Sequence, residues 1–125
     1  MSEEQRKEER YLYKSKLIVT ENDHHYEGHI VDFSYSGLKV KLSQITGLSA
    51  SSVVNINLIE LQKISKKFVL SNLLYKVVRT SANNVLHLQV CNATTLEVCQ
   101  NFFSILVRNN AKHFTCHPLK EKSNP

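Results

Sequence analysis

The sequence of 125 residues contains no pattern typical of a targeting signal or a membrane span. No positively charged start leads into an apolar stretch, and no apolar run approaches the roughly 20 residues that cross a bilayer. The composition, with 42% hydrophobic and 22% charged residues, is typical of one compact domain. We therefore expect a single cytoplasmic domain without a membrane span.

Cysteine and glycine are scarce, and their scarcity excludes several kinds of site. Cys91, Cys99 and Cys116 are an odd number without the spacing of a redox motif, so we expect reduced thiols rather than a disulfide framework. With three glycines, the chain has no glycine loop of the kind that cradles phosphates. No nucleophile with a base and no carboxylate pair stands out either. The sequence therefore predicts that the protein is not an enzyme.

A metal site is also not expected. His113, Cys116 and His117 lie close together in the sequence, but a structural zinc site takes four ligands and a fourth is missing. We expect His24 and His25 at an exposed turn. The remaining strand histidines, His29 and His87, are expected to face solvent. We predict no metal and no cofactor.

Positive charge is in excess, with sixteen Lys and Arg against eleven Asp and Glu and a pI near 9.2. This balance favours an anionic partner, a class that includes nucleotides, nucleic acids and membrane surfaces. The opening residues are highly polar and of mixed charge, so residues 1–11 are expected to form a flexible arm. Residues 112–125 are expected to form a C-terminal tail.

Between these ends, at residues 12–111, the pattern is mainly β. Residues 38–43 and 54–58 alternate apolar and polar side chains, which is typical of strands with one buried face. Two hairpins are expected, one with its turn at residues 21–25 and one with its turn at residues 81–84, where asparagines tolerate a left-handed backbone. Five or six strands this short, with turns this frequent, predict a small antiparallel β-barrel, because closure removes exposed edges. Residues 60–72 fit no single pattern.

One helix is expected after the last strand. Thr94 with Glu97 three residues later forms a capping-box pattern at its start. Apolar residues then recur at helical spacing and predict a face that packs on the barrel: Leu96, Cys99, Phe102, Phe103 and Leu106.

Two short motifs carry chemistry that the framework does not require. The first is Arg6-Lys7-Glu8-Glu9-Arg10, whose spacing of four places both arginines on one side of a helix or a strand. A guanidinium can donate two hydrogen bonds to guanine O6 and N7 or pair with phosphate, which lysine does less well. Lys7 is therefore a secondary candidate beside Arg6 and Arg10.

The second motif is Asp32-Phe33-Ser34-Tyr35-Ser36-Gly37, between two expected strands. Asp32 can accept hydrogen bonds from guanine N1 and N2, and Ser34 can bind a base edge or a phosphate. Gly37 is expected to supply a backbone conformation that a Cβ would penalise. Such a turn can hold the edge of a guanine.

Taken together and in this order, Arg6-x-x-x-Arg10 and Asp32-x-Ser34-x-x-Gly37 resemble the two-part signature of the PilZ domain family. The basic segment 77–79 and the terminal helix also match that family's layout. The resemblance implies a bacterial six-stranded split barrel that binds cyclic di-GMP on its outside and signals to an effector protein controlling motility, biofilm or virulence. It assigns the ligand to Arg6, Arg10, Asp32, Ser34 and Gly37, with Lys7 and Arg79 as further candidates.

The mechanism we expect is that the ligand orders the arm of residues 1–11 against the barrel and so creates or hides a surface for the partner. Two alternatives remain open. The first is a PilZ scaffold for protein interaction that binds no nucleotide. The second, less favoured, is a basic β-barrel that binds RNA or single-stranded DNA by stacking bases on tyrosines, for which the candidates are Tyr11, Tyr13, Tyr26 and Tyr35.

Overall fold

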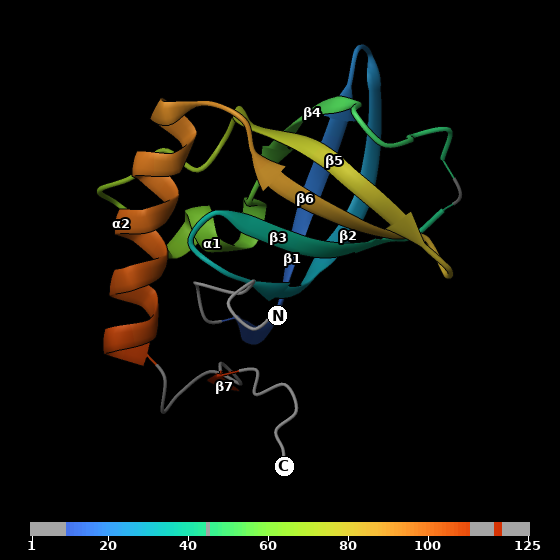
Figure 1. Ribbon diagram of the computed structural model, residues 1–125. Helices are drawn as coiled ribbons and strands as arrows, with labels where there is room; N and C mark the ends of the chain where they lie inside the picture. Colours follow the sequence, from blue (N-terminus) through green and yellow to red (C-terminus); the bar gives the residue numbers. More distant parts are fainter. Residues whose placement is uncertain (1–9, 45, 111–116, 119–125) are drawn as a thin grey trace, which may run out of the picture.

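The computed structural model describes residues 10–44, 46–110 and 117–118, and its strands form a closed barrel flanked by helices (Figure 1). The strands are β1 (Tyr11–Glu21), β2 (His24–Phe33), β3 (Gly37–Leu42), β4 (Val53–Asn57), β5 (Leu73–Ser81), β6 (Val85–Val90) and β7 (His117–Pro118). The helices are α1 (Ile59–Ile64) and α2 (Ala93–Asn110).

The barrel closes through antiparallel pairing of six strands in the order β2-β3-β6-β5-β4-β1, with β1 pairing back to β2. The two residues of β7 add to the other edge of β1, opposite Tyr11 and Leu12. The prediction of a mainly β, six-stranded barrel with a C-terminal helix is therefore confirmed. Within the described residues, no helix has the length and hydropathy needed to span a membrane.

Both predicted hairpins are present. In the β5–β6 turn, Asn83 and Asn84 adopt φ values of 66° and 63°, as their tolerance of the left-handed region predicts. The β1–β2 turn is tighter than expected, because backbone pairing continues to Glu21 and His24 and leaves two residues between the strands. The polar side chains at residues 21–25 suggested a longer loop, but the backbone hydrogen bonds between paired strands do not require apolar side chains.

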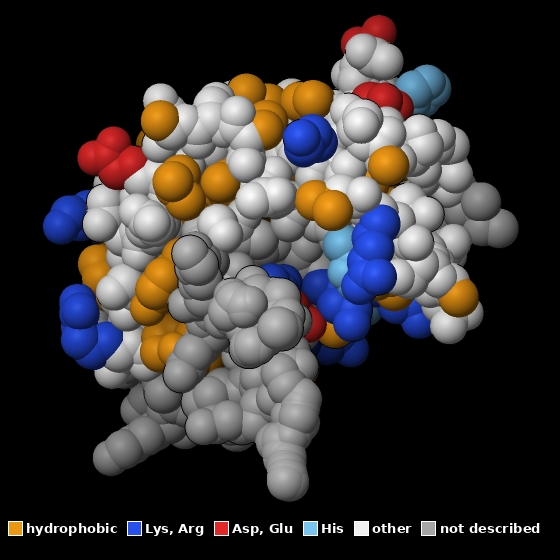
Figure 2. Space-filling model, in the orientation of Figure 1, with side chains coloured by type: hydrophobic (Ala, Val, Ile, Leu, Met, Phe, Trp, Pro, Cys, Tyr) orange, Lys and Arg blue, Asp and Glu red, His pale blue; other side chains and the backbone are white. Residues whose placement is uncertain are grey.

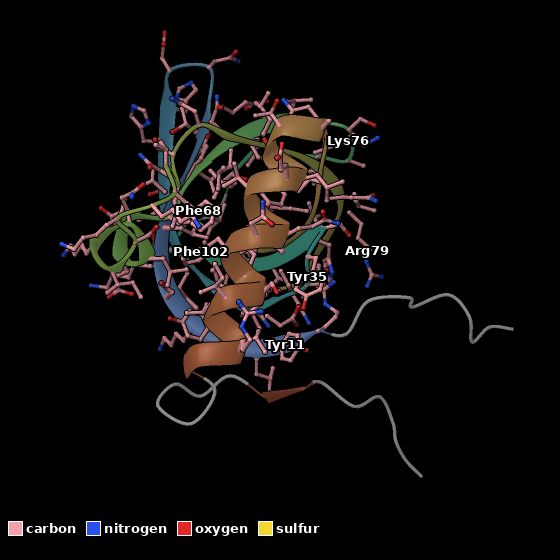
Figure 3. The ribbon with its side chains drawn as sticks, turned by 90° about the vertical axis from the view of Figure 1, so that its left-hand side faces the viewer. Tyr11, Tyr35, Phe68, Lys76, Arg79 and Phe102 are labelled. Carbon is pink, nitrogen blue, oxygen red and sulfur yellow. The ribbon has the colours of Figure 1, made fainter. Side chains whose placement is uncertain are left out.

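The core lies inside the barrel and beneath α2. Leu38, Val40 and Leu42 face inward while Lys39 and Lys41 face outward, which confirms the predicted alternation. α2 lies alongside the barrel in Figure 1, and its buried Phe103 stacks on Phe33 with a ring-centroid distance of 4.3 Å. The helical aromatic face is therefore core packing, as expected. In Figure 3, Phe102 lies beside Phe68, with a centroid distance of 6.2 Å.

The start of α2 differs from the capping-box prediction, which is wrong. The Thr95 N–H donates to the Asn92 side-chain oxygen at 2.8 Å, so Asn92 is the N-cap and Thr94 lies inside the helix. Thr95 is buried, and its hydroxyl accepts a hydrogen bond from the Leu74 N–H at 3.0 Å. The helix begins earlier than predicted because Asn92 can cap it while Thr95 ties it to β5.

Residues 60–72, which fitted no pattern, contain all of α1 after Ile59 and a loop that Gln62 holds together. Its side-chain nitrogen donates to the carbonyls of Ser65 and Phe68, and its side-chain oxygen accepts from the Leu70 N–H. Leu61 and Leu70 are buried by this arrangement. The segment is irregular because one polar side chain replaces regular backbone pairing.

Candidate ligand-binding site

Arg10 and Asp32, one from each sequence motif, form an ion pair at the end of the barrel. Arg10 directly precedes β1, and its Nε and Nη2 both lie 2.7 Å from Oδ1 of Asp32. The Asp32 side chain is 3% exposed and the Arg10 side chain 21% exposed. A carboxylate this deeply buried requires charged or hydrogen-bonding partners, and Arg10 supplies them.

Ser34 and Gly37 complete this arrangement by closing a tight turn between β2 and β3. The Ser34 N–H donates to the Gly37 carbonyl at 2.9 Å, and the Gly37 N–H donates to the Ser34 hydroxyl oxygen at 3.1 Å. Nη1 of Arg10 lies 3.4 Å from the same hydroxyl oxygen. The turn therefore contacts the guanidinium directly and helps to fix its position.

The reason for glycine at position 37 differs from the one predicted. No described glycine has a positive φ, so the backbone conformation at Gly37 does not exclude a side chain. A Cβ there would instead lie 3.1 Å from the Leu88 carbonyl oxygen and 3.4 Å from Nη1 of Arg10. Glycine is needed because the neighbouring strand and the guanidinium approach closely.

These residues line one cleft of about 460 Å³ on the outside of the barrel. Of the predicted site residues, the cleft gathers Arg10, Asp32, Ser34, Gly37 and Arg79. In Figure 3, the exposed Arg79 side chain projects outward from the wall of the barrel. The structure thus brings together residues that the sequence places in three separate segments. Arg6 and Lys7 lie outside the described residues.

The cleft also contains Lys39 and His87, which sequence reasoning did not select. His87 lies on the outward face, as expected, but is half-buried there, and its Nε2 lies 2.8 Å from the Ser81 hydroxyl oxygen. Burial, followed by the positive charges of Arg79 and Lys39, lowers the pKa of His87 below its usual 6.5. Strand alternation shows that these residues share an outward face, but only the pairing of β3 with β6 shows that they are neighbours.

A larger cleft of about 660 Å³ lies over β1, β2 and β3, away from the signature residues. Lys14, Lys16, Lys41 and His29 line it together with Glu27 and Glu60. His29 lies on the outward face, as expected, but is half-buried there, and burial with Lys14 and Lys41 lowers its pKa. None of the predicted site residues that the structure describes lines this cleft, so its size does not make it the better candidate.

Other chemistry receives little support from the described part of the chain. It contains no group of three or more His, Cys, Asp or Glu side chains arranged to hold a metal. His113 and Cys116 lie outside it. Cys91 and Cys99 are free thiols, and burial raises the pKa of Cys99 to about 11, so this thiol is a poor nucleophile.

The tyrosines proposed as stacking platforms for nucleic acid are mostly engaged in packing. Tyr13 is buried, and Tyr11, Tyr26 and Tyr35 are partly buried against the core. Tyr11 also packs on Phe33, with a centroid distance of 5.6 Å. This burial weakens the case for base stacking along a single strand.

Comparison with known protein families agrees with the geometry. The sequence model of the PilZ domain matches residues 4–102, which includes both motifs, the whole barrel and the first part of α2. A search of the curated proteins found no match.

Proposed function

The chain belongs to the PilZ domain family, whose members are ligand-binding domains for cyclic di-GMP, and from this we propose that it is a cyclic di-GMP receptor that signals to a partner protein. One observation carries the proposal. Arg10 meets Asp32, Ser34 and Gly37 in a single outward-facing cleft, although 22 residues separate it from Asp32. We propose a binding role, without catalysis, in the cytoplasm.

The ion pair suggests how a guanine enters. Guanine presents N1–H and N2–H donors together with O6 and N7 acceptors, so it can hydrogen-bond to both a carboxylate and a guanidinium. In our proposal, the guanine donors replace Arg10 on the Asp32 carboxylate, and Arg10 turns to guanine O6 and N7 or to a phosphate. The exchange keeps the buried carboxylate satisfied, which avoids the cost of an unpaired charge.

The arm supplies the second arginine in this proposal. Arg6 precedes Arg10 by four residues, so once Arg10 engages the ligand, Arg6 can reach the same molecule. Arg10 and Tyr11, which were expected to belong to the flexible arm, are already held by Asp32 and by β1, so in this proposal it is the part of the arm before Arg10 that orders over the cleft and changes the surface offered to a partner protein. Support for this step comes from the position of Arg10, which joins the arm to the cleft at the start of β1.

The proposed function is tested by ligand selectivity. Cyclic di-GMP, cyclic di-AMP and GTP are titrated separately into the protein by calorimetry at moderate salt. We expect saturable binding of cyclic di-GMP alone, because cyclic di-AMP has no guanine to match Asp32 and Arg10, and GTP lacks the second guanine and the two phosphodiesters that meet the basic cleft. Arg108→Ala removes an exposed arginine in the last turn of α2, outside the cleft. It controls for the general loss of one positive charge and should bind cyclic di-GMP normally. Absence of binding would identify the protein as a scaffold that does not recognise nucleotide.

A further inference from the structure

We propose that Lys39, His87 and Arg79 form an anion subsite for a phosphodiester of the ligand, and that His87 takes up a proton when this subsite is filled. The inference rests on the proposed function and adds to it a group of binding residues beyond the two-part signature.

The three side chains form a row across three adjacent strands. Lys39 of β3 lies directly opposite His87 of β6, and His87 lies directly opposite Arg79 of β5. Directly opposed residues on antiparallel strands present their side chains on the same face, with Cβ atoms roughly 5 Å apart. All three line the same cleft as Arg10 and Asp32. Figure 2 shows Lys and Arg side chains gathered beside a histidine on this face of the barrel.

Two strand irregularities produce this row. In β5 the register shifts between Val77 and Arg79, so Val78 is an extra residue and is 48% exposed. Without that bulge, Val78 rather than Arg79 would face His87. A second shift, in β2 between Ile30 and Asp32, places Asp32 opposite Lys39. Bulges commonly re-aim side chains at binding sites, and here they add a cation at one end of the row and a carboxylate at the other.

Charged side chains from β5, β3 and β2 and from the residue before β1 lie around His87. Arg79, Lys39 and Arg10 are positive, and Asp32, which is negative, is already paired with Arg10. Burial and these cations hold the pKa of His87 below 6.5, so the free protein keeps the ring neutral near pH 7. A phosphodiester in the cleft adds a negative charge beside the ring, which favours the protonated form.

The Ser81 hydroxyl allows His87 to change its protonation state without losing its position. It lies 2.8 Å from Nε2, and a hydroxyl can both donate and accept a hydrogen bond. The contact therefore persists in the neutral and the protonated ring. A group fixed in place that is neutral when free and charged when bound couples ligand affinity to pH.

The sign of the coupling follows from linkage. If the bound ligand raises the pKa of His87, binding consumes protons, and affinity increases as the pH falls. The increase ends when the pH lies below the pKa of His87 in the free protein, because the ring is then charged in both states. Affinity should change little at pH above the pKa of the bound protein.

The test is the number of protons taken up on binding. Cyclic di-GMP is titrated calorimetrically at a pH of about 6.5, close to the ordinary histidine pKa, in buffers of different ionisation enthalpy. We expect proton uptake by the wild type and by His29→Gln, which alters a half-buried histidine of the other cleft, and its loss in His87→Gln. Equal uptake in wild type and His87→Gln, or none in the wild type despite binding, would overturn the subsite. Failure of the wild type to bind at all would instead overturn the proposed function.

Two further experiments identify the anion that fills the subsite and the cations that bind it. Sulfate, which keeps its charge over this pH range, should not shift the His87 ring resonances at concentrations equal to those of the dinucleotide; an equal shift would overturn the assignment to the phosphodiester. Lys39→Gln and Arg79→Gln should each weaken binding about tenfold, the effect of losing one charge-assisted hydrogen bond. Lys14→Gln, in the other cleft, is the matched control. Unchanged affinity in both cleft variants would also contradict the subsite.

Discussion

At the scale of single residues, the Arg10–Asp32 pair links the folding of the protein to its proposed function. Arg10→Ala leaves a carboxylate that is 3% exposed without its charged partner, so we expect the free energy of unfolding to fall by about 2 to 3 kcal/mol. The double variant Arg10→Ala with Asp32→Asn removes the unpaired charge and should recover most of that loss. Urea unfolding measures both. A stable single variant would show that the pair contributes little to folding.

Gly37 permits a second prediction at this scale, with a control provided by the chain itself. The Cβ of Gly37→Ala would crowd the Leu88 carbonyl and the Arg10 guanidinium, whereas a Cβ at Gly47 meets nothing within 4 Å. We expect Gly37→Ala to lower stability by about 1 kcal/mol and to weaken cyclic di-GMP binding, because Arg10 must move. Gly47→Ala should change neither. Identical behaviour of the two variants in unfolding and titration would contradict the steric role of Gly37.

The half-buried histidines predict how stability depends on pH. Folding lowers the pKa of His29 and His87 below the 6.5 of the unfolded chain, so the unfolded state binds protons more readily. Their contribution to stability is complete above pH 6.5 and is lost as the pH falls through their folded pKa values. The melting temperature of the free protein should therefore drop between about pH 7 and 5, and the drop should shrink in a His29→Gln, His87→Gln double variant. An equal drop in both proteins would assign the effect to other groups.

At the scale of elements, the sequence predicts the helix α2 correctly but assigns it the wrong N-cap residue. Asn92→Ala should cost about 1 kcal/mol, because it removes the acceptor for the Thr95 N–H. Thr94→Ala should have little effect, since Thr94 is exposed inside the helix. The midpoints of thermal or urea unfolding compare the two variants. A larger loss of stability for Thr94→Ala than for Asn92→Ala would show that Thr94, and not Asn92, caps the helix.

The elements also show which parts of the fold local sequence patterns can predict. Strands β3 and β4 could be predicted because alternation of apolar and polar residues reports one buried face, and the β5–β6 turn because asparagine tolerates a left-handed backbone. The segment around α1 could not, since it depends on Gln62 bonding to residues of its own loop. The bulges in β2 and β5 likewise leave no local pattern, because a bulge is defined by the register of the partner strand.

At the scale of the whole molecule, barrel closure assembles the cleft. β1 pairs with β2, β2 with β3, and β3 with β6, so the segment before β1, the β2–β3 turn and the outward face of β6 meet at one place. The signature motifs could be found in the sequence because each is short and local. Lys39 and His87 could not, because their proximity depends on strands that are distant in sequence but adjacent in the closed barrel.

The central claim is that Arg10 and Asp32 bind the dinucleotide. Its most direct test is a calorimetric titration of cyclic di-GMP into the wild type and into the Arg10→Ala, Asp32→Asn double variant, with circular dichroism showing that both are folded. We predict saturable binding by the wild type and, from the loss of guanine contacts worth about 1 to 3 kcal/mol each, binding by the double variant weaker by at least about tenfold. Equal affinity in the two proteins, or no binding by the wild type, would contradict the claim.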